Sequence, residues 1–424
     1  MERVPSFCLR SGVKEWKATV GEGKLLAVAE KHYLKKLKNP EVYLSEKLAS
    51  SSSAQKIKEL AADSGKVLIV CDDMTRPTPT AKILPVISEF LERGGVALNN
   101  QTVLFATGSH RPMSEDEAFK KIGARLWGKI KWVNHDWNKK LAKIGRTPSG
   151  IPIEVNPILL EHRCIIGIGS VFPHRYCGWS GGGKIILPGV SGAETVSQTH
   201  WMPYHDASIC LGNDNNMAIR EIMSAAKSAG LSFLVQCICG GNGELNDIVI
   251  GEPWKAHSEA VQKAAMAMTV KVPVADVVIA QAWPEEADLW QACKALYAAE
   301  NVVSRGGHII IVASLNEGIG PHKIYAELMD SRLETILEYK DRRDSAGLAA
   351  AAAYVTYMVR RNASVSFVTD SPFFSEIKNI TAFNLYNDLQ EAINYLNMKH
   401  SGLTFSVLKE APLILPVAAE RSCN

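Results

Sequence analysis

The sequence predicts an α/β protein of two domains, each built on a largely parallel sheet flanked by helices. Short runs of β-branched residues alternate with helical patterns along the chain, and this alternation is typical of layered α/β folds. The alternation restarts near residue 275. A length of 424 residues also exceeds what one ordinary core accommodates, and it suits two domains.

Four short runs in the first half have the composition of buried strands, at residues 67–71, 102–105, 131–133 and 164–168. Between the first two runs, apolar residues recur at helical spacing over 81–93, and two glycines close the pattern. Ser114 and Glu117 have the spacing of a capping box, which predicts that another helix begins there.

The second half repeats this organisation. Strands are predicted at 277–279, 308–312 and 365–368, and helices at 287–300 and 385–396. The alanine tract 349–353 is interpreted as part of a helix. We place the domain boundary near 270–273, which divides the chain into residues 1–268 and 269–424, and we leave the extreme C-terminus free to return to the first domain.

The composition narrows the classes of partner. The formal net charge is only +3, so no basic patch suggests a nucleic-acid partner. No apolar run reaches the roughly 18 residues of a membrane span, and the first 17 residues lack the apolar core of a signal peptide. The nine cysteines are odd in number and form no Cys-x-x-Cys motif, which favours reduced thiols and a cytoplasmic location.

Polar clusters directly follow several of the predicted strands. Ligands of open α/β sheets bind at the carboxyl ends of strands, so we expect one active site, in the cleft between the domains. The first cluster is Asp73, Met74, Thr75 and Arg76. Arg76 has the planar fork that binds carboxylate or phosphate. The alternative is a strand-exit loop with a surface ion pair.

The second cluster is centred on His110, which follows a glycine at the end of the next strand. Imidazole is suited to proton transfer near neutral pH, and the glycine would allow close approach to a ligand. The alternative is a histidine that caps the following helix.

The third cluster extends from His174 to His200. Gly178, Gly183 and Lys184 match the start of a Walker A loop, but Ile185 replaces the magnesium-binding hydroxyl and Pro188 would break the helix that should follow. We therefore expect a glycine-rich backbone that contacts a ligand through its N–H groups, with Lys184 as a cation or a nucleophile. The alternative for His200 is a core histidine beside an aromatic residue.

The fourth cluster is Gln291 and Lys294, three residues apart and therefore on one face of the predicted helix 287–300. These side chains could hold a ligand carboxylate or phosphate from across the cleft. The alternative is a solvated helix face.

Together these motifs resemble the nickel-pincer lactate racemase family. The resemblance rests on Asp-x-Thr-Arg-Pro at 73–77, Gly-x-His-Arg-Pro at 108–112, Pro-His at 173–174, Gly-x-Ser-Gly-Gly-x-Lys-x-x-x-Pro-Gly at 178–189, the later histidine at 200 and Gln-x-x-Lys at 291–294. It implies a nickel(II) pyridinium-3,5-bisthiocarboxylic acid mononucleotide, the nickel-pincer nucleotide, attached covalently through Lys184 and made by separate maturation proteins. It implies His200 as the nickel ligand, which suits an imidazole.

The resemblance also implies roles for the remaining residues. His110 and His174 would be the acid/base pair; Asp73, Met74, Thr75, Arg76 and Pro188 would line the cofactor; Arg76, Gln291 and Lys294 would contact the substrate. Apart from the resemblance, we expect Tyr176 and Trp290 to shape the substrate pocket, because they stand near His174 and Gln291 in the sequence. The implied reaction inverts C2 of a small 2-hydroxy acid by proton-coupled hydride transfer to and from the cofactor. Inversion of such a centre requires a base on each side of it, which two histidines would provide.

The chain departs from the family in one region. Lactate-specific members carry a tryptophan in the C-terminal domain, whereas this chain is alanine-rich at 349–353, with Tyr354 or Tyr357 as the nearest aromatic residue. This difference leaves room for a larger or more polar 2-hydroxy acid. Two other functions stay open: a non-catalytic binder of a carboxylated or phosphorylated small molecule, and a zinc hydrolase with His110, His174 and His200 as ligands. The sequence does not determine the oligomeric state.

Overall fold

The first sheet contains the four strands that were predicted in the first half of the chain. In the computed structural model, which describes residues 5–32, 35–380 and 383–419, it has the strand order β13-β12-β9-β4-β5-β6. Its strands are β4 (Val67–Asp72), β5 (Gln101–Ala106), β6 (Lys131–Asn134), β9 (Cys164–Ser170), β12 (Leu231–Cys239) and β13 (Leu245–Gly251). Neighbours are parallel except for β13, which is antiparallel to β12. The four strands predicted in this half are confirmed.

Helices cover both faces of this sheet. One face packs on α1 (Pro40–Ser50), α2 (Ser52–Ser64), α3 (Thr80–Glu92) and α4 (Glu115–Ile122), and the other on α7 (Met217–Ser228) and α8 (Pro253–Met268). This arrangement explains why every residue of β4 and β9 is buried and why these strands are continuously apolar. The predicted capping box is confirmed, because Ser114 accepts from the backbone of Glu117 at the start of α4.

The second sheet has the order β18-β17-β16-β15-β19-β3, and all its neighbours are parallel. Its strands are β15 (Ala275–Gln281), β16 (Val303–Val312), β17 (Ala363–Val368), β18 (Asn384–Tyr386), β19 (Thr404–Leu408) and β3 (Lys24–Ala29). The three strands predicted in this half are confirmed.

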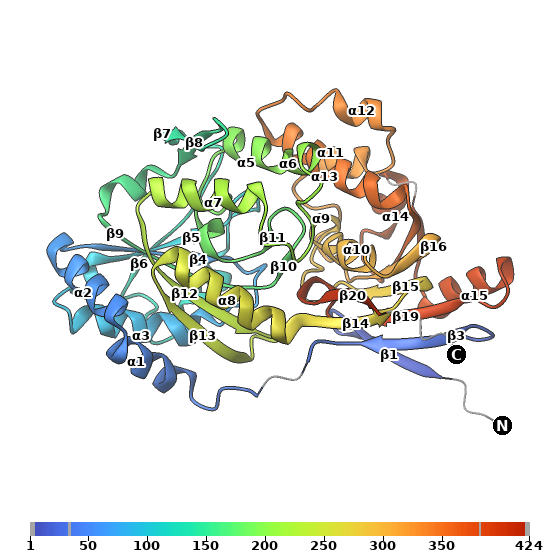
Figure 1. The fold of residues 1–424 in the computed structure, drawn as a ribbon, viewed down its shortest axis with the longest axis horizontal. Helices are drawn as coiled ribbons and strands as arrows, with labels where there is room; N and C mark the ends of the chain where they lie inside the picture. Colours follow the sequence, from blue (N-terminus) through green and yellow to red (C-terminus); the bar gives the residue numbers. More distant parts are fainter. Residues whose placement is uncertain (1–4, 33–34, 381–382, 420–424) are drawn as a thin grey trace.

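The strands near the N-terminus do not join the first sheet, although the expected division places them in the first domain. Strand β3 pairs with β19 of the second sheet, and the hairpin of β1 (Ser6–Ser11) and β2 (Lys14–Thr19) packs on the same core. Figure 1 shows these blue strands beside the red C-terminal segment. A strand's own sequence does not name its partner, so local patterns could not reveal this return. The last strand, β20 (Leu415–Ala419), pairs with β14 (Thr269–Pro273), where the boundary was drawn.

Two predicted helices begin later than expected. In place of one helix over 287–300, Asp288 caps α9 (Leu289–Ala292), and α10 (Lys294–Ala299) follows after Cys293. In place of a helix over 385–396, residues 384–386 form β18, and Asp388 caps α15 (Leu389–Lys399). Both errors have the same cause, because an aspartate that caps a helix from its side chain ends the preceding segment.

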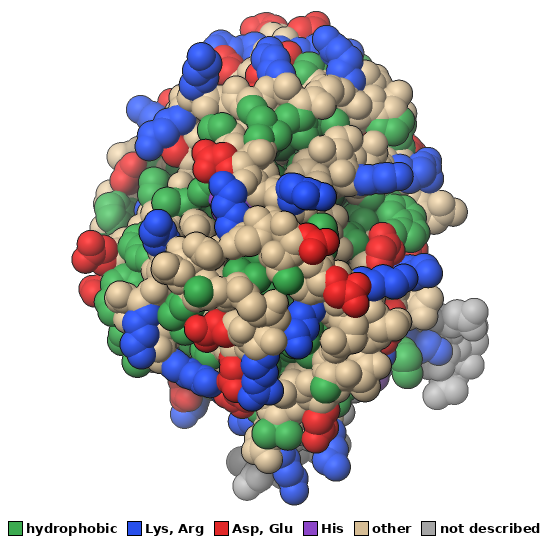
Figure 2. Space-filling view, turned by 90° about the vertical axis from the view of Figure 1, so that its left-hand side faces the viewer, with side chains coloured by type: hydrophobic (Ala, Val, Ile, Leu, Met, Phe, Trp, Pro, Cys, Tyr) green, Lys and Arg blue, Asp and Glu red, His purple; other side chains and the backbone are tan. Residues whose placement is uncertain are grey.

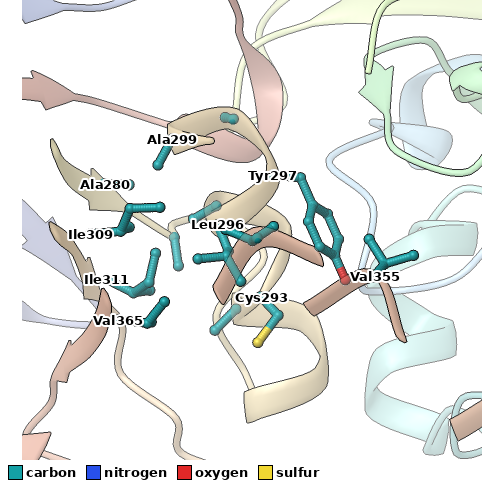
Figure 3. Close-up of a cluster of buried hydrophobic side chains, with 14 of the residues drawn as sticks. Ala280, Cys293, Leu296, Tyr297, Ala299, Ile309, Ile311, Val355 and Val365 are labelled. Atoms are coloured by element: carbon teal, nitrogen blue, oxygen red, sulfur yellow. The ribbon is translucent and has the colours of Figure 1, made fainter. Parts of the chain in front are cut away.

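The alanine tract lies in α13 (Ser345–Arg360), a buried helix of the second core. Figure 3 shows part of this core: Leu296 of α10 and Cys293, which precedes that helix, lie near Ile309, Ile311 and Ala280, whereas the ring of Tyr297 extends toward Val355 of α13. The remaining elements are β7 (Ala142–Arg146), β8 (Pro152–Val155), β10 (Pro173–His174), β11 (Gly178–Trp179), α5 (Ala193–His200), α6 (Met202–His205), α11 (Lys323–Leu328), α12 (Leu333–Leu337) and α14 (Phe374–Ile380), with short 3-10 turns at 98–100, 157–161, 182–185 and 411–413.

Three surface and compositional features complete the description. On the face drawn in Figure 2, acidic and basic side chains are interspersed with hydrophobic ones, and neither sign of charge forms one continuous area. No helix within the described residues is long and apolar enough to cross a membrane. The eight cysteines in the described ranges are free thiols, and Cys423 lies outside those ranges.

Candidate active site

A cavity of about 130 Å³ lies where the loops after β4, β5 and β9 meet residues of the second half. In the first sheet β4 has β5 on one side and β9 on the other, so the connections diverge there, and ligands bind at such switch points. Most of the predicted site residues line the cavity: Asp73, Arg76, His110, His174, Tyr176, Lys184, Pro188, His200, Trp290 and Lys294. The others, Met74, Thr75 and Gln291, line an adjoining cavity that shares Asp73 and His110.

The loop after β4 is held by a buried lysine. Lys121 of α4 donates to Asp72 at 2.9 Å and to the backbone oxygens of Arg76 and Thr78 at 3.0 and 3.2 Å. These bonds turn the loop so that Asp73 and Arg76 face the cavity rather than solvent. The alternative of a surface ion pair is therefore wrong, since Asp73 is 3% exposed.

Asp73 and His110 form a close hydrogen-bonded pair at the cavity. His110 Nδ1 lies 2.7 Å from one carboxylate oxygen of Asp73, and the Thr75 hydroxyl donates to the other at 2.5 Å. Burial by itself would raise the pKa of Asp73, but the charges of His110 and Arg76 and the bond from Thr75 lower that pKa well below its ordinary value. Asp73 is thus ionised and holds the proton of His110 on Nδ1. His110 does not cap the next helix, because Ser114 does.

The free nitrogen of His110 faces the second half of the chain. Its Nε2 atom lies 3.0 Å from the amide nitrogen of Gln291, and the amide oxygen of Gln291 accepts from Lys294 at 2.6 Å. The amide therefore donates to Nε2, which acts as a hydrogen-bond acceptor. Gln291 is only 2% exposed, so the alternative of a solvated helix face is wrong.

Lys184 lines the same cavity, in contact with His174. Its amine nitrogen is 3.4 Å from His174 Nε2. Burial lowers the pKa of Lys184, and the nearby charge of Arg76 adds to this effect, while Cys177 opposes it. Burial and then the charges of Lys184 and Lys294 hold the pKa of His174 well below its ordinary value, so its imidazole is neutral. A desolvated amine of lowered pKa has the character of a nucleophile.

His200 ends α5 with one ring nitrogen occupied. Its Nδ1 donates to the backbone oxygen of Val196 at 2.8 Å, and the ring of Tyr176 packs on it at 4.8 Å. Burial, together with the charge of Lys184, lowers the pKa of His200 to about 4. The imidazole is therefore neutral and keeps Nε2 free, which is the arrangement of a metal-binding histidine. Among the described residues no group of three His, Cys, Asp or Glu side chains could hold a metal ion.

The glycine-rich segment before Lys184 was expected to contact a ligand through its N–H groups, but those of Gly182 and Gly183 bond within the protein. The N–H group of Gly182 donates to the Gln236 side chain at 2.6 Å, and that of Gly183 to the sulfur of Met223 at 3.1 Å. These groups are satisfied within the protein rather than presented to a ligand. The absence of side chains is explained by packing, because a Cβ on Gly182 would lie 2.6 Å from the ring of His257. Residues 182–185 form a 3-10 turn, without the long helix of a Walker A motif.

One charged residue of the site, Glu285, was not predicted from the sequence. Its side chain is fully buried, contacts the amine of Lys294, and lies 3.5 Å from Arg76 Nη1. It thereby holds two cations from different halves of the chain beside each other. Burial first, and then Arg76, lower the pKa of Lys294 to about 8, while Glu285 opposes the decrease. A signal was present, since the acidic run 285–288 follows the strand at 275–281.

The aromatic residues nearest to 349–353 in the sequence lie away from the cavity. Neither Tyr354 nor Tyr357 lines the cavity; Tyr354 packs on Trp201 and Tyr204, with ring centroids 5.9 and 5.3 Å apart. The α13 residue at the cavity wall is Ala352. On a helix, neighbouring positions point in different directions, so the identity of the facing residue requires the packing to be known. The wall beside it is formed by Tyr297 and Tyr325, which the sequence analysis also missed.

Comparison with known proteins finds relatives across most of the chain. The lactate racemase N-terminal domain model matches residues 12–210, and the lactate racemase C-terminal domain model matches residues 270–408. The lactate racemase of Thermoanaerobacterium thermosaccharolyticum is 27% identical over 347 residues, which cover 78% of this chain and 80% of that protein. The lactate racemase of Lactiplantibacillus plantarum is 28% identical over 315 residues, 73% of each chain.

Solved structures agree on the fold. The lactate racemase apoprotein from T. thermosaccharolyticum superposes with a TM-score of 0.85 at 24% identity, over 98% of this chain and 100% of that one. A protein from Thermotoga maritima superposes with a TM-score of 0.68 at 21% identity, over 88% of this chain and 98% of its own. Fold and relatives together define an isomerase of the racemase class. The chain belongs to the lactate racemase family.

Proposed function

We propose that the chain is a racemase or epimerase that inverts C2 of a 2-hydroxy acid, with a nickel-pincer nucleotide as cofactor. The observation that carries the proposal is the pair of histidines at one cavity, each with its own partner. His110 is oriented by Asp73, and His174 lies against Lys184. Inversion requires a proton acceptor for either enantiomer, and these two imidazoles supply them.

The residues present fit the cofactor that the family resemblance implies. Lys184 is a buried amine of lowered pKa that could carry the covalent attachment, and His200 has a free Nε2 that could ligate nickel. Asp73, Arg76 and Pro188 line the same cavity, with Met74 and Thr75 beside them. When bound, the cofactor would accept and return the C2 hydrogen as hydride, which no side chain can do.

The protein's own residues would move the proton and hold the substrate. His110 Nε2, which now accepts from the Gln291 amide, would accept the hydroxyl proton of one enantiomer, and the His174 imidazole would serve the other. Arg76 and Lys294 would bind the carboxylate, because both are cations at the cavity wall. Tyr176 and Trp290 would enclose the rest of the substrate.

The proposal also includes the domain division, the supply of the cofactor and the cellular location of the enzyme. The domains would be residues 1–268, without the returning N-terminal strands, and 269–424, with the cavity as the cleft between them. Separate maturation proteins would make the cofactor, and the enzyme would work in the cytoplasm. The non-catalytic binder and the zinc hydrolase are the competing functions. The three histidines have separate partners, which favours the racemase over a zinc site built from them.

Intact mass and elemental analysis test the proposal directly. Protein purified from a host that makes the cofactor should carry one adduct and nickel. Lys184→Ala should lose both, and racemisation should fall by at least about 10³-fold, as expected when a covalent group is removed. Lys143→Ala, an exposed lysine outside the cavity, is the matched control and should keep adduct and activity. An unmodified mass with bound zinc would contradict the proposal, and ligand affinity without C2–H exchange would indicate a binder.

A further inference from the structure

Two of the cations at the cavity are placed to bind a ligand carboxylate. Arg76, Lys184 and Lys294 are the cations that line it within the described residues. Glu285 contacts Arg76 and Lys294 and offsets one of their two charges. Lys184 would be consumed by cofactor attachment under the proposed function. Asp72 is paired with Lys121, whereas Asp73 keeps its charge and accepts hydrogen bonds from Thr75 and His110. Arg76 and Lys294 can therefore bind one ligand carboxylate, and a second carboxylate would lack a cation among the described lining residues, which is costly for a buried charge.

The wall beyond these cations carries no ionised group. It is formed by Val196 of α5, Trp290 of α9, Tyr297 of α10, Tyr325 of α11 and Ala352 of α13. Burial raises the pKa of Tyr297 to about 12 and that of Tyr325 well above its ordinary value, so both phenols are neutral. The Tyr325 hydroxyl bonds to Thr356 at 3.0 Å, which leaves its ring for the cavity. A wall of aromatic and aliphatic surface favours an uncharged substituent.

Ala352 keeps this wall open. The residue is 3% exposed, on a helix that packs closely against α5 and α11. Close packing explains the run of alanines, as Gly347 of the same helix would place a Cβ 2.5 Å from the Ser197 hydroxyl. A methyl group at 352 lets the backbones approach and occupies little of the cavity. A larger side chain there would extend into the space beside Tyr297 and Tyr325.

We infer that the substrate is a monocarboxylic 2-hydroxy acid whose side chain is uncharged and larger than methyl, and that Ala352 determines this preference. The inference rests on the proposed function and names the substrate class of the same site. The carboxylate binds at Arg76 and Lys294, and the substituent at C2 lies against Ala352 and the tyrosine rings. Burial of each additional methylene group in such a pocket favours the larger acid by about 10-fold or more in kcat/KM.

The test is a panel of enantiopure acids with the cofactor-loaded enzyme. The acids are lactate, 2-hydroxybutyrate, 2-hydroxyisovalerate, 3-phenyllactate and malate, and the readouts are racemisation and C2–H exchange. We expect at least one of the larger uncharged acids to exceed lactate by about 10-fold or more in kcat/KM, and malate to fall below that acid by at least as much. The same acids should raise the Tm of the loaded enzyme in the same order.

Substitution at position 352 tests whether the size of this residue determines the substrate preference. Ala352→Leu should lower kcat/KM for the preferred acid by about 10- to 100-fold and change that for lactate less than about threefold. Ala352→Ser is the matched control, because it keeps the volume small and its hydroxyl can bond to the preceding helical turn. It should keep the wild-type order of substrates. The panel of acids with the wild-type enzyme tests the inferred substrate class even if Ala352→Leu does not fold.

The outcomes distinguish the inference from the proposed function. Racemisation of lactate in preference to every larger acid overturns the inference and leaves the proposed function intact. Preference for malate likewise overturns the charge argument alone. An unchanged substrate order in a folded Ala352→Leu enzyme removes the role of Ala352. Absence of exchange with every acid, in protein that carries the Lys184 adduct and nickel, overturns both.

Discussion

The two halves of the chain contribute to the site in different ways. The first supplies Lys184, His200 and the two histidines that we propose as acid and base, each on a loop or helix end held by bonds within that half, such as Asp73 to His110 and His200 to Val196. The second supplies Gln291, Lys294 and Glu285, which lie after β15 and reach back to His110 and Arg76. The groups proposed to react therefore lie on the first half, and the second half completes the charges around them.

Some properties of the site depend on contact between the two halves, and others are set within the first half. The positions of His174 and Lys184 relative to each other are set within residues 174–184. The hydrogen bond to His110 Nε2 and the pairing of Arg76 require residues of the second half. Chemistry should thus respond most to changes in the first half, and substrate affinity to changes in the second.

The largest effect is expected for the two histidines. His110→Ala and His174→Ala should each lower racemisation by about 10²- to 10⁴-fold, because each removes one proton acceptor. The Lys184 adduct should stay in both variants, as measured by intact mass. In single turnover, each variant should still form keto acid from one enantiomer, and from opposite enantiomers.

His205→Ala, an exposed histidine outside the cavity, is the control and should retain full activity. Racemisation that survives in both single variants would remove the assigned roles. Loss of the adduct in His110→Ala would show instead that the halves share the work of cofactor attachment.

A smaller effect is expected for Glu285→Gln in the second half. Burial and Arg76 lower the pKa of Lys294 to about 8, and Glu285 keeps it from falling further, so the variant should have a lower pKa. Carboxylate binding requires the charged amine. KM should therefore rise as pH increases through about 8 in the wild type and at lower pH in the variant. If the pKa falls by about one unit, the rise in KM should be about threefold near pH 7.5 and should approach about 10-fold at pH values above 8, with kcat changed less.

Glu285→Asp should restore part of the wild-type pH profile of KM, because it returns the charge in a shorter side chain. If Glu285 were only structural, the variant would lose stability with no shift in that profile. A loss of kcat without a change in KM would assign Glu285 to chemistry and would contradict the division between the halves.

The smallest effect is expected for Arg111→Gln at the surface. Arg111 pairs with Glu117 of its own half and with Glu317 of the other, at 2.8 and 2.7 Å. Arg111 and Glu317 are about half exposed and Glu117 is 20% exposed, so solvent and salt screen these pairs, and the free energy of unfolding should fall by less than about 1 kcal/mol. The decrease should shrink in high salt, as measured by urea denaturation. Arg93→Gln, whose partner Glu89 lies on the same helix, is the matched control.

A larger rise in KM for Arg111→Gln than for Arg93→Gln would show that this ion pair helps to hold the second half in place. Equal effects of the two variants would confine it to a surface contribution.

The sequence by itself predicted the parts that local patterns encode. The β-branched runs of β4, β5 and β9 mark strands that are covered on both faces, and Ser114 marks the start of a helix. The motifs around Asp73, His110 and Lys184 follow such strands, and the carboxyl ends of parallel strands meet at one edge of a sheet. Their convergence on one cavity could therefore be expected from the order of elements alone.

Only the tertiary structure decided the contacts between residues far apart in the chain. The pairing of β3 with β19 joins segments near residues 24 and 404, and no local pattern names a partner at that distance. Glu285 became a site residue because Arg76 lies beside it, and Ala352 because the packing of α13 turns that methyl group into the cavity. The glycines before Lys184 looked like a ligand-binding loop but are required by His257 and Gln236. Periodicity and composition report which face of a segment is buried, whereas the identity of what covers that face depends on the whole fold.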